Sequence, residues 1–212
     1  MKIAIIGAGN VGRALAGSAV RAGHQVTISA ADPQHARDAA KTTGARAASS
    51  NTDAVTPADV VILAVPYAEV DGVLEDLGGA LDGKVVVDAT NPLSATYSGL
   101  AVDGASAAEH IQARVPAARV AKAFNTIFAA RQADPIVNGM PVDGYVAADD
   151  DAAKATVLAL VASLGFRPVD AGPLSMAQAL ESLALLNITL QARTGGSWQS
   201  AWRLVEPSAR AA

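Results

Sequence analysis

Three glycines near the amino terminus have the spacing of a phosphate-binding turn. Gly7, Gly9 and Gly12 follow the apolar run 2–6 and precede an alanine-rich stretch. In such a motif the first glycine permits a tight turn, the second lets a pyrophosphate approach bare backbone, and the third lets the following helix approach the strand. Amide groups at the start of that helix then face the phosphates. Because the motif lies between a predicted strand and a predicted helix, it predicts a dinucleotide-binding site.

Further candidate binding residues follow the ends of the predicted strands. In a doubly wound sheet, ligands bind outside the carboxyl ends of the strands. Asn, Ser and Thr in such places also satisfy loop backbone, so a turn role stays open for each polar member. The candidate cofactor-binding residues chosen on this basis are Gly7, Gly9, Asn10, Val11, Gly12, Ser29, Ala64, Val65, Pro66, Tyr67, Thr90, Asn91, Phe124 and Asn125.

The end of the second strand decides between NAD and NADP in this class of site. An acid there holds the ribose hydroxyls of NAD, whereas an arginine accepts the extra phosphate of NADP. This chain has Ala30 and Ala31, and the following Asp32 and Pro33 are typical of a helix start. Basic residues on that helix are interpreted as a solvated face, with a phosphate contact as the alternative: His35, Arg37 and Lys41.

No residue pattern predicts a general acid, base or nucleophile, so the catalytic residues stay unassigned. The three histidines have no metal-ligand spacing and cysteine is absent, so no metal site is predicted. Hydride transfer between two cofactors needs no such group, because the cofactors carry the chemistry. A carbonyl or imine reductase is expected to present a protonating side chain, for which Lys122 and Tyr67 are the candidates.

Composition excludes several classes of partner. The 212 residues are 51% hydrophobic, which is ample for a buried core. With 16 basic and 20 acidic residues the net charge is -4, so no basic patch for nucleic acid or anionic membrane is predicted. Glycines interrupt the apolar start, unlike a signal peptide, and no apolar stretch reaches membrane-spanning length. We therefore expect small-molecule cofactors as partners and a cytoplasmic location.

Short apolar runs alternate with helical stretches along most of the chain. The runs are apolar throughout, as strands covered on both faces require. They lie at residues 3–6, 26–29, 60–65, 85–88, 119–123 and 145–147. The predicted fold class is α/β, a Rossmann-type doubly wound and mostly parallel sheet with a small C-terminal helical lobe. We expect a dinucleotide-binding domain at 1–170, a lobe at 171–212 that completes the acceptor site, and a homodimer formed through the apolar last helices.

Two segments stand apart from this alternation. The loop at 89–104 is long for a connection inside one domain, and loops of that length are often lids or binding segments. Trp198 and Trp202 have helical i,i+4 spacing, and we expect them to pack against the body or a second subunit instead of binding a cofactor.

Taken in order, five segments of the chain resemble the NADPH-dependent reductases of the deazaflavin coenzyme F420. They are residues 2–12, 58–66, 87–93, 121–126 and 167–174, and the last two carry the specific weight because the first two occur in many Rossmann reductases. The resemblance implies NADPH in the first Rossmann crevice, with the deazaflavin stacked on its nicotinamide and covered by Gly172, Pro173 and Leu174. It also implies a Ser-Arg pair where this chain has Ala30 and Ala31, so the choice between NADP and NAD stays open.

The predicted function is that of an oxidoreductase that transfers a hydride between NADP(H) and coenzyme F420 or a flavin. Two alternatives remain at this point. One is an NAD(P)H-dependent reductase of a small imine or carbonyl compound, and the other is a dinucleotide-binding sensor without turnover.

Overall fold

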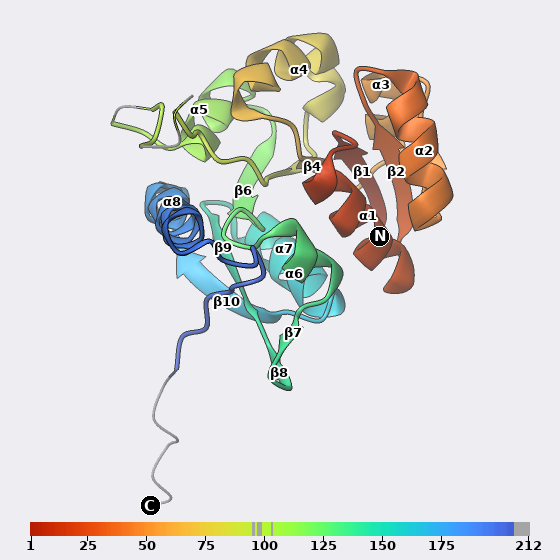
Figure 1. Ribbon diagram of the computed structural model, residues 1–212. Coiled ribbons are helices and arrows are strands. Elements are labelled where there is room, and N and C mark those ends of the chain that lie inside the picture. The colour runs from red at the N-terminus through yellow and green to blue at the C-terminus, as the bar shows by residue number, and fades with distance from the viewer. Residues whose placement is uncertain (95, 97–98, 103, 206–212) are drawn as a thin grey trace, which may run out of the picture.

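A central sheet with helices on both faces organises the molecule (Figure 1). The computed structural model describes residues 1–94, 96, 99–102 and 104–205. Within them the strand order is β10-β9-β6-β5-β4-β1-β2-β3, and a separate hairpin pairs β7 with β8. The strands are β1 (Lys2–Ile6), β2 (Gln25–Ser29), β3 (Arg46–Ala47), β4 (Val60–Leu63), β5 (Val85–Asp88), β6 (Arg119–Ala123), β7 (Ile136–Val137), β8 (Met140–Pro141), β9 (Asp143–Ala148) and β10 (Arg167–Gly172).

The six strands from β3 to β6 are mutually parallel and reverse their winding between β1 and β4. This order is that of the dinucleotide-binding Rossmann fold, whose crevice opens where the winding reverses. The predicted fold class is confirmed. Beyond β6, however, β9 pairs antiparallel and β10 follows β9. The chain therefore leaves β10 towards the amino-terminal ends of the other strands.

The helices cover the sheet in two layers because side chains alternate along each strand. Ile3 and Ile5 face the core shared with α1 and α7, whereas Ala4 and Ile6 face the core shared with α3, α4 and α5. The helices are α1 (Asn10–Arg21), α2 (Pro33–Thr43), α3 (Asn51–Val55), α4 (Val70–Leu77), α5 (Ala107–Arg114), α6 (Ala129–Ala133), α7 (Asp151–Ser163) and α8 (Ala177–Thr194), with 3-10 turns η1 (Tyr67–Glu69), η2 (Gly78–Leu81) and η3 (Leu174–Met176).

Two helix ends follow from local sequence. Gly23, at φ 84°, comes directly after the C-cap of α1, a left-handed conformation that glycine adopts without strain. Asp32 caps α2, and its side chain accepts a hydrogen bond from the backbone N–H of Gln34 at 2.7 Å. The helix-start role predicted for Asp32 is thus observed, and this carboxylate is engaged with backbone.

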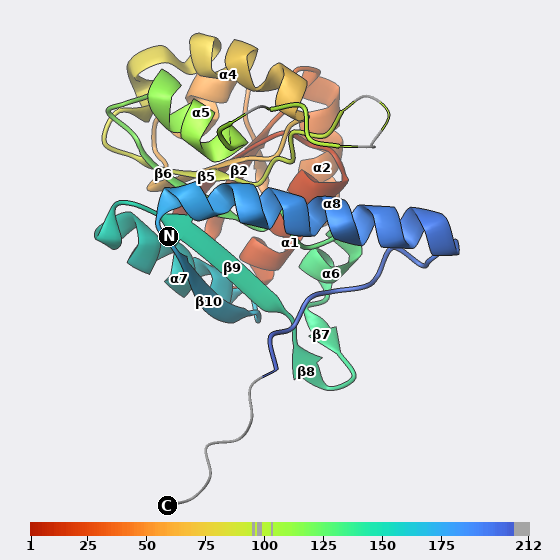
Figure 2. The ribbon, with the colours of Figure 1, turned by 90° about the vertical axis from the view of Figure 1, so that its left-hand side faces the viewer.

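The last helix lies across the molecule. Figure 2 shows α8 as a long helix with α5 on one side and β9 on the other. No helix in the described part of the chain is both long enough and apolar enough to span a membrane.

The predicted helical pairing of the two tryptophans is wrong. The chain after Gly195 is not helical, and Trp198 has a φ of 57°. Trp198 instead stacks edge to face on Phe128 at 5.5 Å, so that it packs against the body as expected. In the long loop, Leu93 and Leu100 form a single bridge, while positions 95, 97, 98 and 103 lie outside the described residues.

The carboxylate of Asp143 anchors the tail after α8 to the sheet. It is fully buried and accepts two hydrogen bonds from the Arg167 guanidinium, at 2.6 and 2.7 Å, and one from the Leu204 N–H at 2.6 Å. Burial alone would raise the pKa of Asp143, but these bonds and one from Tyr145 outweigh it and lower the pKa below 3.8.

We predict that Asp143→Asn lowers the free energy of unfolding by about 3 kcal/mol at neutral pH, because charge-assisted hydrogen bonds are lost from a buried site. The lowered pKa means that this stabilisation is complete above pH 3.8 and is lost as the pH falls through the folded-state value. Urea unfolding over a pH series should therefore show the two proteins converging in acid. A constant difference at every pH would contradict the assignment.

Candidate dinucleotide site

The glycine turn joins β1 to α1 at the point where the winding reverses. Gly7 has a φ of 115°, and a Cβ added there would collide with the carbonyl of Ala64 at the end of β4. A Cβ at Gly12 would collide with the carbonyl of Gly7. Both glycines are therefore required by the fold itself, because the turn, β4 and α1 touch through backbone.

Gly9 has no such internal reason to be glycine. Its backbone is extended, with φ -75° and ψ -170°, which any residue adopts, and a Cβ there would meet no atom within 4 Å. The space that a side chain would fill lies beside two cavities that Gly9 itself lines. A glycine that neither conformation nor packing demands leaves bare backbone that a ligand can approach closely, as the second glycine of such a motif does.

The first of these cavities, of about 430 Å³, is mainly apolar and lies at the carboxyl ends of β1, β2 and β4. Its walls include the predicted binding residues Gly7, Ala64, Val65 and Pro66. The second, of about 380 Å³, lies on the α1 and α2 side of the turn. The predicted residue Asn10 lines it.

A third cavity, of about 100 Å³, lies on the other side of α1 at the ends of β5 and β6. The predicted residues Val11, Asn91, Phe124 and Asn125 all line it, together with residues of α6 and α8. The two asparagines hold each other: Asn91 donates to the carbonyl of Asn125 at 2.9 Å, and the Asn125 amide donates to Asn91 Oδ1 at 3.0 Å. The structure thus brings both together as predicted.

Two buried acceptor oxygens, on residues that line this third cavity, have no hydrogen-bond partner among the described residues. They are Asn125 Oδ1 and Gln132 Oε1, on side chains exposed by only 6% and 1%. Buried polar atoms are normally paired, and an unpaired one needs an explanation such as an absent ligand. Gln132 is fixed in place because its amide donates to the carbonyls of Phe124 and Ile127.

Backbone strain is present at the same place. Phe124 follows the last buried position of β6 with a φ of 67°, which is uncommon for a bulky residue. Its ring is buried and packs edge to face on Phe166 at 6.1 Å. Such strain persists only where the surroundings fix it, and it is concentrated at functional sites.

The remaining predicted residues that follow strand ends do not line these cavities. Ser29 and Thr90 are buried, and Ser29 donates to Asn51 at 2.7 Å. Tyr67 packs edge to face on His110, and burial raises the pKa of its hydroxyl. Leu174 is buried in the core on the α5 face, so the predicted cover formed by Gly172, Pro173 and Leu174 stays a prediction.

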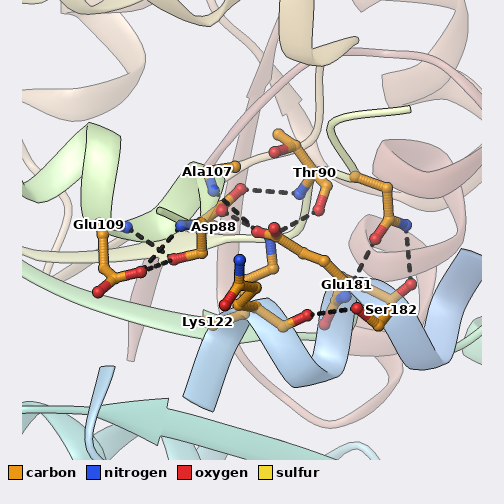
Figure 3. A network of polar contacts seen from close by, with 11 residues as sticks. Asp88, Thr90, Ala107, Glu109, Lys122, Glu181 and Ser182 are labelled. Carbon is orange, nitrogen blue, oxygen red and sulfur yellow. Dashed lines mark hydrogen bonds and ion pairs between the residues drawn. The ribbon is translucent and has the colours of Figure 1, made fainter. Parts of the chain in front are cut away.

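A buried ionic cluster holds α8 against the strand ends (Figure 3). Lys122 Nζ donates to Asp88 at 2.7 Å, to Glu181 at 2.7 Å and to the carbonyl of Thr90 at 2.8 Å. The three ionised side chains are fully buried. Glu181 also accepts from the N–H of Ala107 at the start of α5. One carboxylate of α8 is thereby bonded to both a strand and a neighbouring helix.

This geometry is a correction to the role considered for Lys122. An ammonium group has three hydrogens, and here all three are donated within the protein. Lys122 therefore presents no proton to a substrate in this structure. Burial raises the pKa of Glu181, an effect that the Lys122 charge opposes.

Sequence reasoning missed several residues of the site. Gln132 and Asn187 line the third cavity, and Arg13, which gave no pattern, lines the second. His35, interpreted as a solvated face with a phosphate contact as the alternative, also lines the second cavity. Asn187 had one usable signal, because it is a polar residue on the buried side of the largely apolar helix α8. Gln132 had none, since its position depends on the turn after β6.

The sequence of this chain matches those of known proteins. Residues 2–92 match the family described as NADP oxidoreductase, coenzyme F420-dependent. The F420-dependent NADP reductase of Methanothermobacter marburgensis is 34% identical over 212 residues, which covers 90% of this chain and 92% of that protein. The chain belongs to the F420-dependent NADP reductase family. Members of this family are NADP-dependent oxidoreductases, and the predicted enzyme class is confirmed.

Two further relatives limit what similarity says about the hydride acceptor of this chain. A crystal structure of a candidate F420-dependent NADP reductase from Arthrobacter sp. FB24 superposes with a TM-score of 0.85 at 32% identity, covering 93% of this chain and 96% of that one. The metalloreductase STEAP3 of Rattus norvegicus is 32% identical over 185 residues, but this chain spans only 36% of its length. A metalloreductase as well as F420-dependent NADP reductases therefore match this chain.

We predict that Gly9→Ala weakens NADPH binding about tenfold or more, which is at least ~1.4 kcal/mol, because the methyl group occupies the space beside the phosphates. The free energy of unfolding should change by no more than about 0.5 kcal/mol, since the methyl group contacts nothing. Titration followed by nicotinamide fluorescence and urea unfolding measure the two quantities. Gly7→Ala is the contrasting variant and should destabilise the fold. Unchanged affinity in Gly9→Ala would show that nothing approaches this backbone.

We predict that Lys122→Met lowers the free energy of unfolding by about 3–5 kcal/mol, because it leaves two carboxylates buried without a cation. Urea denaturation measures the loss. Adding Asp88→Asn and Glu181→Gln to the same chain should restore part of it, since no buried charge then remains. Lys41→Met, on the exposed face of α2, is the control and should change stability by no more than about 0.5 kcal/mol. A Lys122→Met protein as stable as the parent would refute the structural role of the cluster.

Proposed function

We propose that this protein transfers a hydride between NADP(H) and the deazaflavin coenzyme F420. The observation that carries the proposal is Gly9, whose missing side chain leaves bare backbone between two cavities in a chain of the F420-dependent NADP reductase family. A pyrophosphate fits that backbone because the amide groups of α1 begin there, and the helix dipole favours negative charge.

The three cavities suggest how the coenzyme lies. The mainly apolar cavity beside Val65 and Pro66 suits a flat purine base. On the other side of α1, the third cavity offers Asn125 Oδ1 and Gln132 Oε1 as unpaired acceptors, which suit the amide hydrogens of a nicotinamide carboxamide or of a deazaflavin ring. The glycine turn lies between them, at the place of the pyrophosphate.

The side chains of this chain would orient the rings and exclude water. When bound, the two cofactors would supply the hydride chemistry, and the proton that accompanies hydride addition to the deazaflavin would come from solvent, so no side chain is required as an acid or base. Asn125 and Gln132 would fix the ring that carries the carboxamide, while Phe128, Ala184 and Ile188 supply apolar cover. Holding donor and acceptor carbons in contact is the main contribution that a protein can make to such a step.

The lobe at 171–212 completes the acceptor site in this proposal. Its helix α8 contributes Ala184, Asn187 and Ile188 to the third cavity. At about 100 Å³ this cavity is smaller than the roughly 300–1,000 Å³ of most ligand pockets, so binding of both rings requires movement around it. The proposal also retains a homodimer, for which Leu186 and Leu190 of α8, 49% and 45% exposed, offer an apolar face.

The other acceptors have less support from the geometry. A small-imine or carbonyl reductase needs a proton donor at the site. Of the two candidates, Lys122 donates all three of its hydrogens internally, and Tyr67 lines none of the three cavities. A flavin in place of the deazaflavin would use the same apolar cover and the same acceptors. Those two acceptors are therefore separated by experiment.

We expect purified protein with NADPH to bleach the absorbance band of oxidised F420, and to do so faster than with an equal concentration of FMN or FAD. Gly9→Ala should lose most of this rate, because it weakens coenzyme binding. Asn125→Leu, which removes one unpaired acceptor, should slow turnover at saturating NADPH about tenfold or more. Saturable NADPH binding without reduction of F420 would overturn the proposed acceptor, and absence of NADPH binding by folded protein would overturn the whole proposal.

A further inference from the structure

The cavity on the α1 and α2 side of the glycine turn has a chemistry that the proposed hydride transfer does not use. It measures about 380 Å³ and is lined by Ala8, Gly9, Asn10, Arg13, Ala30 and His35. Two of these residues can donate hydrogen bonds to an anion, Arg13 through a positively charged guanidinium and His35 through an imidazole N–H, and they approach the cavity from different helices. No acidic residue lines it.

Arg13 is held with its donors available. It follows Gly12 on α1, and its side chain is partly buried. Its Nε donates to the carbonyl of Ala8 at 2.8 Å, which fixes the guanidinium beside the glycine turn. Its two Nη groups have no hydrogen bond to any described residue. A planar guanidinium with free donors is the side chain best suited to phosphate recognition.

His35 faces the cavity from the first turn of α2. Its side chain is 66% exposed, and its Nε2 lies 3.9 Å from an oxygen of Asp32. The same Asp32 is engaged in capping α2 and does not line the cavity. The beginning of α2 adds a partial positive charge on this side, which favours an anion over a cation.

The end of β2 leaves room for a bulky anion. An acid projecting from that position would select a ribose that bears two free hydroxyls. Here the position is Ala30, which lines the same cavity as Arg13 and His35. The side chain at this position is therefore small and uncharged. Discrimination against a ribose phosphate would require a carboxylate there.

We propose that Arg13 and His35 form the subsite for the phosphate ester on the adenosine ribose of NADP(H), in place of an arginine after β2. The inference rests on the proposed function, because it assumes that the dinucleotide lies along the glycine turn. It assigns coenzyme selectivity to Arg13 of α1 and His35 of α2. Ala30 leaves room for the phosphate because its side chain is small.

Separate titrations with NADPH and NADH, followed by nicotinamide fluorescence, test the subsite. We expect Arg13→Gln to weaken NADPH binding about tenfold or more, the size of a lost charge-assisted hydrogen bond, and NADH binding no more than about twofold. His35→Gln should act in the same direction with a smaller factor. His35→Lys, which places a permanent charge at the position, should tighten NADPH binding and leave NADH binding unchanged.

The matched control is Lys41→Gln, which removes a positive charge from the last turn of the same helix and lines no cavity described above. It should leave both affinities unchanged. Arg13→Lys keeps the charge and should restore part of the NADPH preference if the subsite is electrostatic. Equal losses of NADPH and NADH in Arg13→Gln would show that the residue only shapes the turn, and would overturn the inference.

Failure of the dinucleotide site and failure of the selectivity subsite give different results in these titrations. If the unaltered protein binds neither coenzyme, the dinucleotide site itself is refuted. If it binds both and neither variant changes their ratio, the dinucleotide site stands and the selectivity subsite falls.

Discussion

Close backbone contact between the first strand, its neighbour β4 and the first helix is the constraint on which the rest of the site depends. Gly7 and Gly12 make that contact possible, because a side chain on Gly7 would collide with the carbonyl of Ala64 after β4, and one on Gly12 with the carbonyl of Gly7. The result is a bend narrow enough to expose α1 amide groups at the mouth of the crevice. At Gly9, in contrast, the space that a side chain would fill is empty. The same short segment thus contains two glycines that the fold requires and a third, Gly9, that leaves backbone open to a ligand.

A second constraint acts at the other end of the sheet. Insertion of β9 antiparallel to β6 sends the chain away from the crevice, and α8 brings it back. The buried bonds between Glu181, Lys122 and Asp88 fix α8 on the strand ends. Burying three ionised groups carries a large desolvation cost, so such a cluster is weak evidence for stability and better evidence for a specified position. Here the cluster specifies the position of α8, the helix that lines the third cavity.

Much of the fold could be predicted from the chain alone because its signals are local. The strands β5 and β6 were predicted with their observed bounds, and the Asp32 cap was predicted from two adjacent residues. The expected helical pairing of Trp198 and Trp202 failed for the converse reason. Their spacing is compatible with a helix, but the left-handed turn at Gly195 ends α8 before them, and tertiary contacts with Phe128 place Trp198.

The sequence by itself determined the alternation of elements and the glycine turn, since both depend on neighbours a few residues apart. It also determined which residues follow each strand, and hence Asn91, Phe124 and Asn125 as neighbours in one cavity. Only the tertiary structure decided that Lys122 is enclosed between two carboxylates, that Gln132 has an unpaired oxygen, and that Arg13 and His35 face one cavity. Those arrangements join residues that are distant along the chain, and their burial and orientation depend on how whole helices pack.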